Sequence, residues 1–274
     1  MHLYLITRAT RPQGADFIRK LHQSGVKAGK SGGVSDSYKH CEFLFMYGMG
    51  GADRYDVALD HIKKGQTLVT FDIGYWQRKR RNRKFRASID GLHCPKYIMR
   101  GPYPGPERWI ASGMRISKDR ECNGPILLVG NGPKSERVGA EGWTVKKALE
   151  IRARFPDRKI LYKPKPQRAI QTGVSYDDIT LEDIDRVLPR VSLVVCRHSN
   201  VAVDACRMGV PVVCEDGAGA AIYPSALDDY KSQPTMATRE EFLHRLAWWQ
   251  WTADELSGGE FWPWLDGVLS NGGH

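Results

Sequence analysis

Apolar residues in the second half of the chain fall into short continuous runs, separated by stretches in which they recur at helical spacing. Such runs predict buried strands, and the spaced stretches predict amphipathic helices. The expected strands are 126–129, 159–162, 191–196 and 211–214, and the expected helices are 143–155, 180–188 and one that ends at Met208 before Gly209. Strands that alternate with helices of this length predict a parallel sheet covered on both faces.

The first half repeats this pattern less regularly. Its expected strands are 2–6, 43–46, 67–71 and 85–89, and the aromatic segment 242–256, with Trp248, Trp249 and Trp251, is expected to be a helix. Two proline- and glycine-rich breaks, 101–106 and 121–125, interrupt the chain between the halves. We therefore expect two Rossmann-like α/β domains, 1–124 and 125–274, with the terminal helix crossing back to the first.

Composition narrows the class of protein. The chain has 274 residues, 41% of them hydrophobic, and no apolar run approaches the ~20 residues of a membrane span. Neither a secretion signal nor a CxxC pair is present, although there are six cysteines. We expect a monomeric, cytoplasmic protein in a reducing environment, without a structural metal.

The net charge of +10 is unevenly distributed. Residues 1–124 carry 23 lysines and arginines against 11 aspartates and glutamates, a net charge of +12, whereas residues 125–274 carry a net charge of −2. An excess confined to one half favours a surface that meets a polyanion, although a solvated basic face would give the same count.

Polar residues follow each predicted strand of the second half, where open parallel sheets bind their ligands. Glycine allows close approach of an anion, lysine and serine donate to phosphate, and a helix N-terminus attracts negative charge. Carboxylates suit ribose or sugar hydroxyls. Each of these turns could instead be purely structural. The candidate donor-binding residues, in strand order, are Gly132, Lys134 and Ser135, then Lys163 and Lys165, then His198, Ser199 and Asn200, and finally Glu215 and Asp216.

The first half contains the most basic stretch of the chain. Seven of the nine residues 78–86 are basic, and they follow two aromatic residues directly. Cations beside aromatic rings suit a nucleic-acid backbone with a base stacked nearby, and the alternative is a solvated basic loop. The candidate DNA-binding residues are Tyr75, Trp76, Arg78, Arg80, Arg81, Arg83, Lys84 and Arg86.

A single carboxylate, Asp72, follows the predicted strand 67–71. An inverting sugar transferase needs a general base to deprotonate the acceptor hydroxyl, and this position at a strand end suits one. Asp72 could equally serve as a partner for an arginine.

The segment His-Ser-Asn-Val-Ala-Val-Asp-Ala, 198–205, followed by Gly-Val-Pro-Val-Val, 209–213, resembles the donor-nucleotide segment of GT-B glycosyltransferases and related epimerases. Ser199, Asp204, Gly209 and Pro211 match that pattern, whereas Lys165 stands where such proteins often have histidine. The order of motifs is similar to that of phage (bacteriophage) glycosyltransferase-like proteins, some of which modify DNA. The resemblance implies a GT-B-like fold, a nucleotide-sugar co-substrate and no required metal cofactor.

These observations predict an enzyme that transfers a sugar from a nucleotide sugar, such as UDP-glucose or another UDP-sugar, to 5-hydroxymethylcytosine or 5-hydroxymethyluracil in DNA. It would act in the host cytoplasm if a phage encodes it. The alternatives are a surface-polysaccharide glycosyltransferase, a nucleotide-sugar epimerase, and a nucleic-acid-binding protein without catalysis.

Overall fold

The computed structural model describes residues 2–6, 12–35, 41–48, 52–78, 83–90, 97–132, 135, 141–165 and 170–272. The chain forms two compact units. The N-terminal unit combines Met1–Pro104 with Arg245–His274, and the central unit is Gly105–His244.

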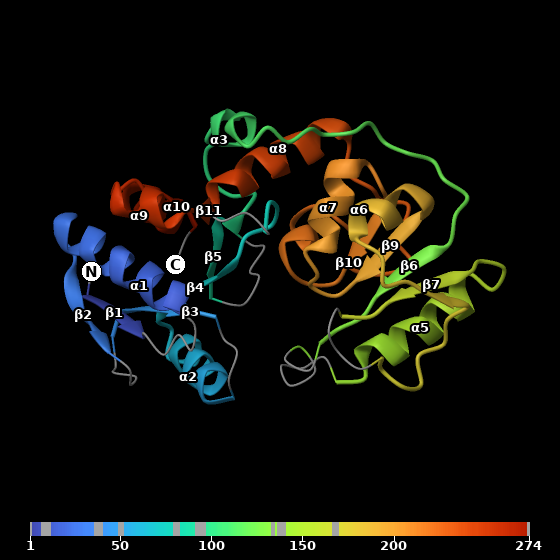
Figure 1. Cartoon of the computed structure of the whole chain (residues 1–274), viewed down its shortest axis with the longest axis horizontal. Helices are drawn as coiled ribbons and strands as arrows, with labels where there is room; N and C mark the ends of the chain where they lie inside the picture. The colour runs from blue at the N-terminus through green and yellow to red at the C-terminus, as the bar shows by residue number, and fades with distance from the viewer. Residues whose placement is uncertain are drawn as a thin grey trace. The chain divides into compact units, whose positions relative to one another are not determined.

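The N-terminal unit is built on a six-stranded sheet of order β11-β5-β4-β3-β1-β2. The strands β1 to β4 are parallel, whereas β5 and β11 are antiparallel to their neighbours. Figure 1 shows α1, α9 and α10 on one side of this sheet and α2 on the other. The elements are β1 (His2–Ile6), α1 (Pro12–Lys27), β2 (Ser31–Ser35), β3 (Phe43–Tyr47), α2 (Ala52–Lys63), β4 (Thr67–Ile73), β5 (Phe85–Ile89), β11 (Gln250–Trp251), α9 (Ala253–Ser257) and α10 (Phe261–Gly272).

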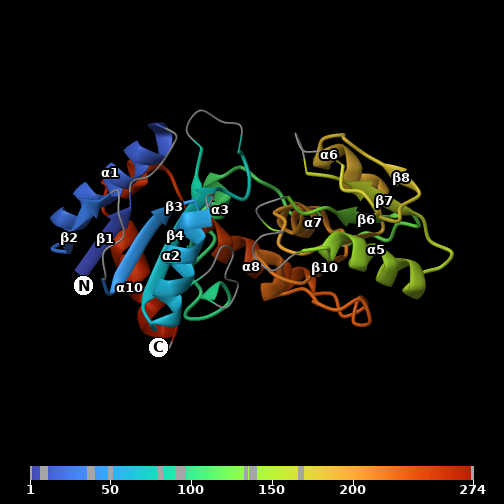
Figure 2. The ribbon, with the colours of Figure 1, turned by 90° about the horizontal axis from the view of Figure 1, so that it is seen from below.

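Alternation along β4 divides its side chains between the two faces of the sheet. Phe71 packs against Phe17 of α1 and Phe261 of α10, with ring centroids 4.8 and 5.6 Å apart. Leu68 joins the cluster beneath α2 on the opposite face. Figure 2 shows α2 in front of β3 and β4 and α10 behind them. Asp72 has the same strand parity as Leu68 and therefore lies on the α2 face.

The central unit is built on a five-stranded parallel sheet of order β10-β9-β6-β7-β8. Apart from the edge strand β8, its strands are short, largely apolar and buried, as a parallel sheet between helices requires. Figure 1 shows α5 on one side and α6 and α7 on the other. The elements are α3 (Glu107–Ala111), β6 (Ile126–Val129), α5 (Trp143–Arg154), β7 (Ile160–Lys163), β8 (Asp178–Ile179), α6 (Ile184–Val187), η3 (Leu188–Arg190), β9 (Leu193–Cys196), α7 (Val201–Met208), β10 (Val212–Cys214) and η4 (Ala218–Ala221); the division between the units falls inside α8 (Met236–Trp248).

The division between the units differs from the expected boundary at residue 124. Segment 105–124 belongs to the central unit because it is bonded to the end of α7. The Ser117 N–H donates to the Arg207 carbonyl at 2.8 Å, and the Arg120 N–H donates to the Gly209 carbonyl at 2.9 Å. The proline-rich break at 101–106 therefore marks the boundary, and the later break does not.

Two expected helices are wrong in extent. Segment 242–256 is not one helix, because α8 ends at Trp248 and β11 then pairs with β5 at the edge of the sheet. The helix expected from Thr180 is α6, which begins only at Ile184. The Thr180 hydroxyl instead accepts the Glu182 N–H at 3.3 Å in the connection that follows β8.

Candidate functional site

The order of strands in the central unit contains a switch point between β6 and β9. From β6 the sheet continues through β7 and β8 on one side, and from β9 it continues to β10 on the other. The connections leaving the two strands therefore diverge and open a crevice at their carboxyl ends, where ligands of doubly wound sheets bind. Gly130–Gly132 follows β6, and Arg197–Asn200 follows β9.

Two predicted donor-binding residues meet at this switch point. Oγ of Ser135, which follows β6, lies 2.6 Å from Nε2 of His198, which follows β9. Ser135 is 9% exposed and His198 is partly buried, so the pair is largely shielded from solvent. Lys134, from the same predicted loop, lies outside the described residues.

The loop after β10 closes over the same strand ends. The Glu215 N–H donates to the Cys196 carbonyl at 3.2 Å, and the Asp216 N–H donates to the Arg197 carbonyl at 2.7 Å. Gly217 has φ of +83°, and a Cβ at this position would lie 2.9 Å from Cα of His198. Glycine is thus needed at 217 for both its backbone conformation and its close approach to His198.

The two carboxylates of this loop already have protein partners. Glu215 accepts a hydrogen bond from the indole N–H of Trp143 on α5. Asp216 accepts the Gly217 N–H at 2.6 Å. Both side chains are exposed and keep further acceptor capacity for hydroxyl groups of a ligand.

The two predicted lysines, Lys163 at the end of β7 and Lys165 after it, differ in burial and contacts. Lys165 is exposed, and its aliphatic stem lies over Gly132, where a Cβ would meet the Lys165 Cγ at 3.5 Å. Lys163 is 8% exposed and donates to the Glu182 carbonyl, and burial lowers the pKa of its ammonium, with Asp183 and Glu182 opposing the shift. Lys163 thus contacts the connection after β8, and its binding of phosphate stays a prediction.

Helix α7 begins beside His198. The Ser199 hydroxyl accepts the Val201 N–H at 3.2 Å, and Asn200 occupies the N-cap without a side-chain cap. The N–H groups of the first turn are bonded within the chain, as that of Ala202 is to the Ser199 carbonyl at 3.1 Å, so α7 presents the positive end of its dipole to the strand ends.

Two further residues at the switch point were not singled out in the sequence. Nδ2 of Asn131, after β6, and Nη1 of Arg197, after β9, are buried donors without a hydrogen-bond partner among the described residues. An unsatisfied buried donor costs about 1–3 kcal/mol, and more when charged, so such atoms mark positions where a ligand or water completes the site. Their signal in the sequence is their place directly after two strand ends.

In the N-terminal unit, Asp72 lies opposite Arg86 in the β4–β5 register, and its Oδ2 is 3.3 Å from Nη2 of the arginine. The Asp72 side chain is 52% exposed, whereas that of Arg86 is 4% exposed and lies 5.3 Å from the centre of the Tyr75 ring. A buried guanidinium thus orients a carboxylate that stays open to a substrate.

The structure corrects part of the predicted DNA-binding set. Tyr75 and Trp76 are 2% and 6% exposed, and the Tyr75 N–H donates to Oε1 of Gln250 at 2.6 Å. Their rings belong to the core and offer no face for a base, and Arg86 is buried with them. Arg78 donates to the Tyr75 carbonyl, Arg83 lies over Phe85, and Lys84 pairs with Glu255. Arg80 and Arg81 lie outside the described residues.

Within the described residues, no group of three or more histidine, cysteine, aspartate or glutamate side chains is arranged to hold a metal ion. No helix in this part of the chain has the length and apolarity to cross a membrane.

No protein family and no curated protein sequence matches the chain. The solved structures that share its fold include two transferase domains. The Thermosulfurimonas dismutans KpsC beta Kdo 2,7 transferase matches with a TM-score of 0.53 at 14% identity, over 94% of this chain and 97% of that one. The beta Kdo 2,4 transferase of the same organism's KpsC matches with a TM-score of 0.52 at 11% identity, over 89% and 90%. The likeness confirms the predicted GT-B-like α/β fold. It gives no support to a DNA-modifying family.

Proposed function

We propose that this protein is a glycosyltransferase that uses a nucleotide-activated sugar and extends a saccharide acceptor. The observation that carries the donor site is the placement of two buried donors, on Asn131 and Arg197, after the same two strands as the Ser135–His198 pair. These donors have no partner among the described residues and, beside the positive end of the α7 dipole, they suit the phosphate oxygens of a nucleotide.

The same donors would act in the reaction. As the bond between the anomeric carbon and the phosphate oxygen breaks, negative charge grows on the leaving nucleotide. Arg197, His198 and Lys165 would stabilise that charge without a metal, because preformed donors need no reorganisation during the reaction. Glu215 and Asp216 would contact hydroxyl groups of the ribose or the sugar.

Asp72 is the proposed general base. It would accept the proton of the acceptor hydroxyl while the oxygen forms its bond to the anomeric carbon, and Arg86 would keep the carboxylate oriented. The two bond changes and the proton transfer balance: the acceptor loses a proton to Asp72, and the nucleotide leaves as an anion.

A saccharide is the favoured acceptor for two reasons. Tyr75, Trp76 and Arg86, which a DNA acceptor site was expected to use, are buried. Two of the solved structures that share the fold are named as Kdo transferases. DNA carrying 5-hydroxymethylpyrimidine remains the alternative acceptor, supported by the net charge of +12 in residues 1–124.

The test is a transfer assay with a panel of CMP-, UDP- and GDP-sugars against acidic oligosaccharides, neutral oligosaccharides and 5-hydroxymethylcytosine DNA, read by product mass. We expect transfer to an oligosaccharide that Asp72→Asn abolishes while donor binding is retained. Transfer to DNA alone would replace the acceptor, and a fully active Asp72→Asn variant would remove Asp72 from the mechanism. Failure of every donor to bind would refute the function.

A further inference from the structure

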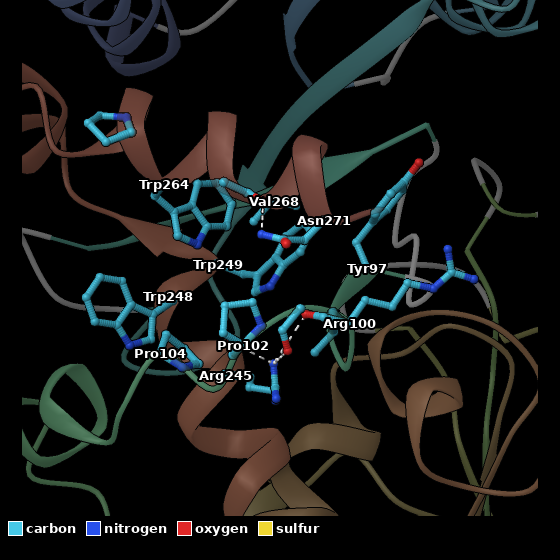
Figure 3. A pocket seen from close by; sticks show the side chains of 14 residues that line it. Tyr97, Arg100, Pro102, Pro104, Arg245, Trp248, Trp249, Trp264, Val268 and Asn271 are labelled. Carbon is cyan, nitrogen blue, oxygen red and sulfur yellow. Dashed lines mark hydrogen bonds between the residues drawn. The ribbon is translucent and has the colours of Figure 1, made fainter. Parts of the chain in front are cut away.

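A cavity of about 200 Å³ lies within the N-terminal unit (Figure 3). Its walls come from segment 97–104, from the end of α8 with the residue that follows it, and from α10. No residue of the proposed donor site and no residue of the Asp72–Arg86 pair lines it.

The cavity is built into the fold. The guanidinium of Arg245, which is 7% exposed, donates from Nη1 to the carbonyls of Arg100, Gly101 and Pro102 at 3.2–3.3 Å. Gly101 has φ of +76°, and a Cβ there would lie 3.3 Å from Cβ of Asn271. This fastening of the 100–102 backbone to α8 and its close packing on α10 give the cavity a preformed shape, as ligand sites usually have.

One wall is aromatic. Figure 3 shows Trp248, Trp249 and Trp264 gathered on one side of the cavity, with Tyr97 and Arg100 on the other. Trp249 and Trp264 meet edge to face, with centroids 5.1 Å apart and planes at 89°. Trp249 is buried, whereas Trp248 and Trp264 are partly exposed and offer indole surface to an incoming ring.

The polar residues of the lining define the charge of the ligand. Two of the fourteen residues, Arg100 and Arg245, are cationic, and none is aspartate or glutamate. A cavity with indole surface and cationic side chains complements a ring that has an apolar face and a negative group. An acidic sugar has both, because its C–H groups form an apolar face and its carboxylate is charged.

The volume limits the ligand to one ring. At about 200 Å³ it is below the roughly 300–1,000 Å³ of pockets that enclose drug-sized ligands. A whole nucleotide sugar is therefore too large, whereas a single sugar unit of a longer chain fits.

The position of the cavity separates it from Asp72. Tyr97, on its wall, donates through its hydroxyl to Asp90 at 3.3 Å, and Asp90 accepts the N–H of Leu68 near the start of β4. Asp72 lies near the other end of that strand. The α10 helix that lines the cavity packs on the Phe71 face of the sheet, opposite the face of Asp72.

We propose that this cavity is a second, non-catalytic binding site that holds one acidic sugar unit of a polysaccharide. The polysaccharide context rests on the proposed function, whereas the binding of an acidic sugar is independent of transfer. Trp248 and Trp264 contact the ring face, and Arg100 at the rim pairs with the carboxylate. Such a site retains the polymer while its end reacts elsewhere.

The test measures binding of glucuronate, glucose and UMP to the whole protein without a nucleotide sugar, by saturation-transfer NMR and tryptophan fluorescence. We expect glucuronate to bind about tenfold more tightly than glucose, because one charged hydrogen bond is lost with the carboxylate. Arg100→Gln should remove this preference, because the charged partner of the carboxylate is lost. The shape of the cavity should be kept, because the backbone carbonyl of residue 100 still accepts from Arg245. Arg115→Gln, at an exposed arginine of the central unit, is the matched control and should leave it unchanged.

Trp248→Ala should weaken glucuronate binding, but loss of the indole could also disturb the fold. Gly267→Leu provides an independent variant, because a Cβ at Gly267 meets nothing within 4 Å and the longer side chain would fill the cavity. It should abolish glucuronate binding while donor binding persists. Equal affinity for glucose and glucuronate, preferred binding of UMP, or binding that survives Gly267→Leu would each overturn the inference. Glucuronate binding without any transferase activity would refute the proposed function and leave this site standing.

Discussion

Oγ of Ser135 and Nε2 of His198 lie 2.6 Å apart, although the residues are 63 positions apart in the sequence. The contact arises because β6 and β9 are neighbours in the sheet and Ser135 and His198 follow their carboxyl ends. One hydrogen bond between a hydroxyl and a neutral imidazole leaves one further O–H or N–H group, which can donate to an anion. This pair, with Asn131 and Arg197, is the basis of the donor site proposed at the switch point.

His198→Ala should weaken binding of the nucleotide-sugar donor by about tenfold, the effect of losing one hydrogen bond to a charged group. The measurement is titration calorimetry with the donor that the transfer assay identifies. Ser135→Ala should have a smaller effect in the same direction. Ser232→Ala, at an exposed serine elsewhere in the central unit, is the control. Equal donor affinity in the His198 variant and the control would exclude His198 from the donor site.

Gly217→Ala should destabilise the protein more than Gly173→Ala. Both glycines have positive φ, but Gly217, with φ of +83° and ψ of −172°, lies in a region that is essentially restricted to glycine and strains other residues by about 1–3 kcal/mol. At Gly173 the nearest atom is 3.9 Å from the added Cβ, whereas at Gly217 the Cβ is 2.9 Å from Cα of His198. The clash should add about 1–3 kcal/mol and displace His198. Chemical denaturation compares the two variants, and equal unfolding free energies would show that the loop yields without disturbing His198.

The Asp72–Arg86 pair should respond asymmetrically to substitution. Asp72 is half exposed, so Asp72→Asn should change the unfolding free energy by about 0–1 kcal/mol, as for a surface ion pair. Arg86 is buried against Tyr75, so Arg86→Gln should cost about 1–3 kcal/mol. Urea denaturation of both variants tests this. A larger loss for Asp72→Asn would mean that the carboxylate has a structural role, and its assignment as the base would lose its basis.

His244 should make the stability of the protein depend on pH. Burial lowers the pKa of His244, against the opposing effects of Glu240 and Glu107. In the unfolded chain this histidine therefore binds its proton at a higher pH than in the folded state, so acidification through about pH 6.5 favours unfolding. The urea concentration at the unfolding midpoint should decrease when the pH is lowered from 7.5 to 5.5, and His244→Gln should make this decrease smaller. An unchanged pH dependence in the variant would assign it to other groups.

Four of the five strands of the central unit could be predicted to within two residues, whereas the two-residue strand β8 was missed. Ile126–Val129, for example, is a continuous apolar run that the sheet buries on both faces. Gly209 ends α7 with φ of +70°, as its position after Met208 predicted. Such features are local, because each strand carries its own hydrophobic signal and glycine its own backbone freedom.

Other features depend on contacts between distant segments and left no local signal. Gln250–Trp251 is a two-residue strand that exists because β5 offers an open edge, so the aromatic segment around it resembled one helix. Tyr75 and Trp76 looked like exposed stacking residues because they precede a basic run, but Gln250, 175 positions away, binds their loop into the core. The unpartnered donors of Asn131 and Arg197 became visible only once β6 and β9 were neighbours.

The pairing of β11 with β5 also has a consequence for the order in which the protein is made. The central unit is one continuous stretch of chain, so a ribosome delivers all of it before residue 245 appears. The sheet of the N-terminal unit, in contrast, lacks its last strand, and its Phe71 face lacks α10, until the C-terminal residues have emerged. During synthesis the central unit can therefore fold first, whereas the N-terminal unit can complete its fold only after the last residues have been translated.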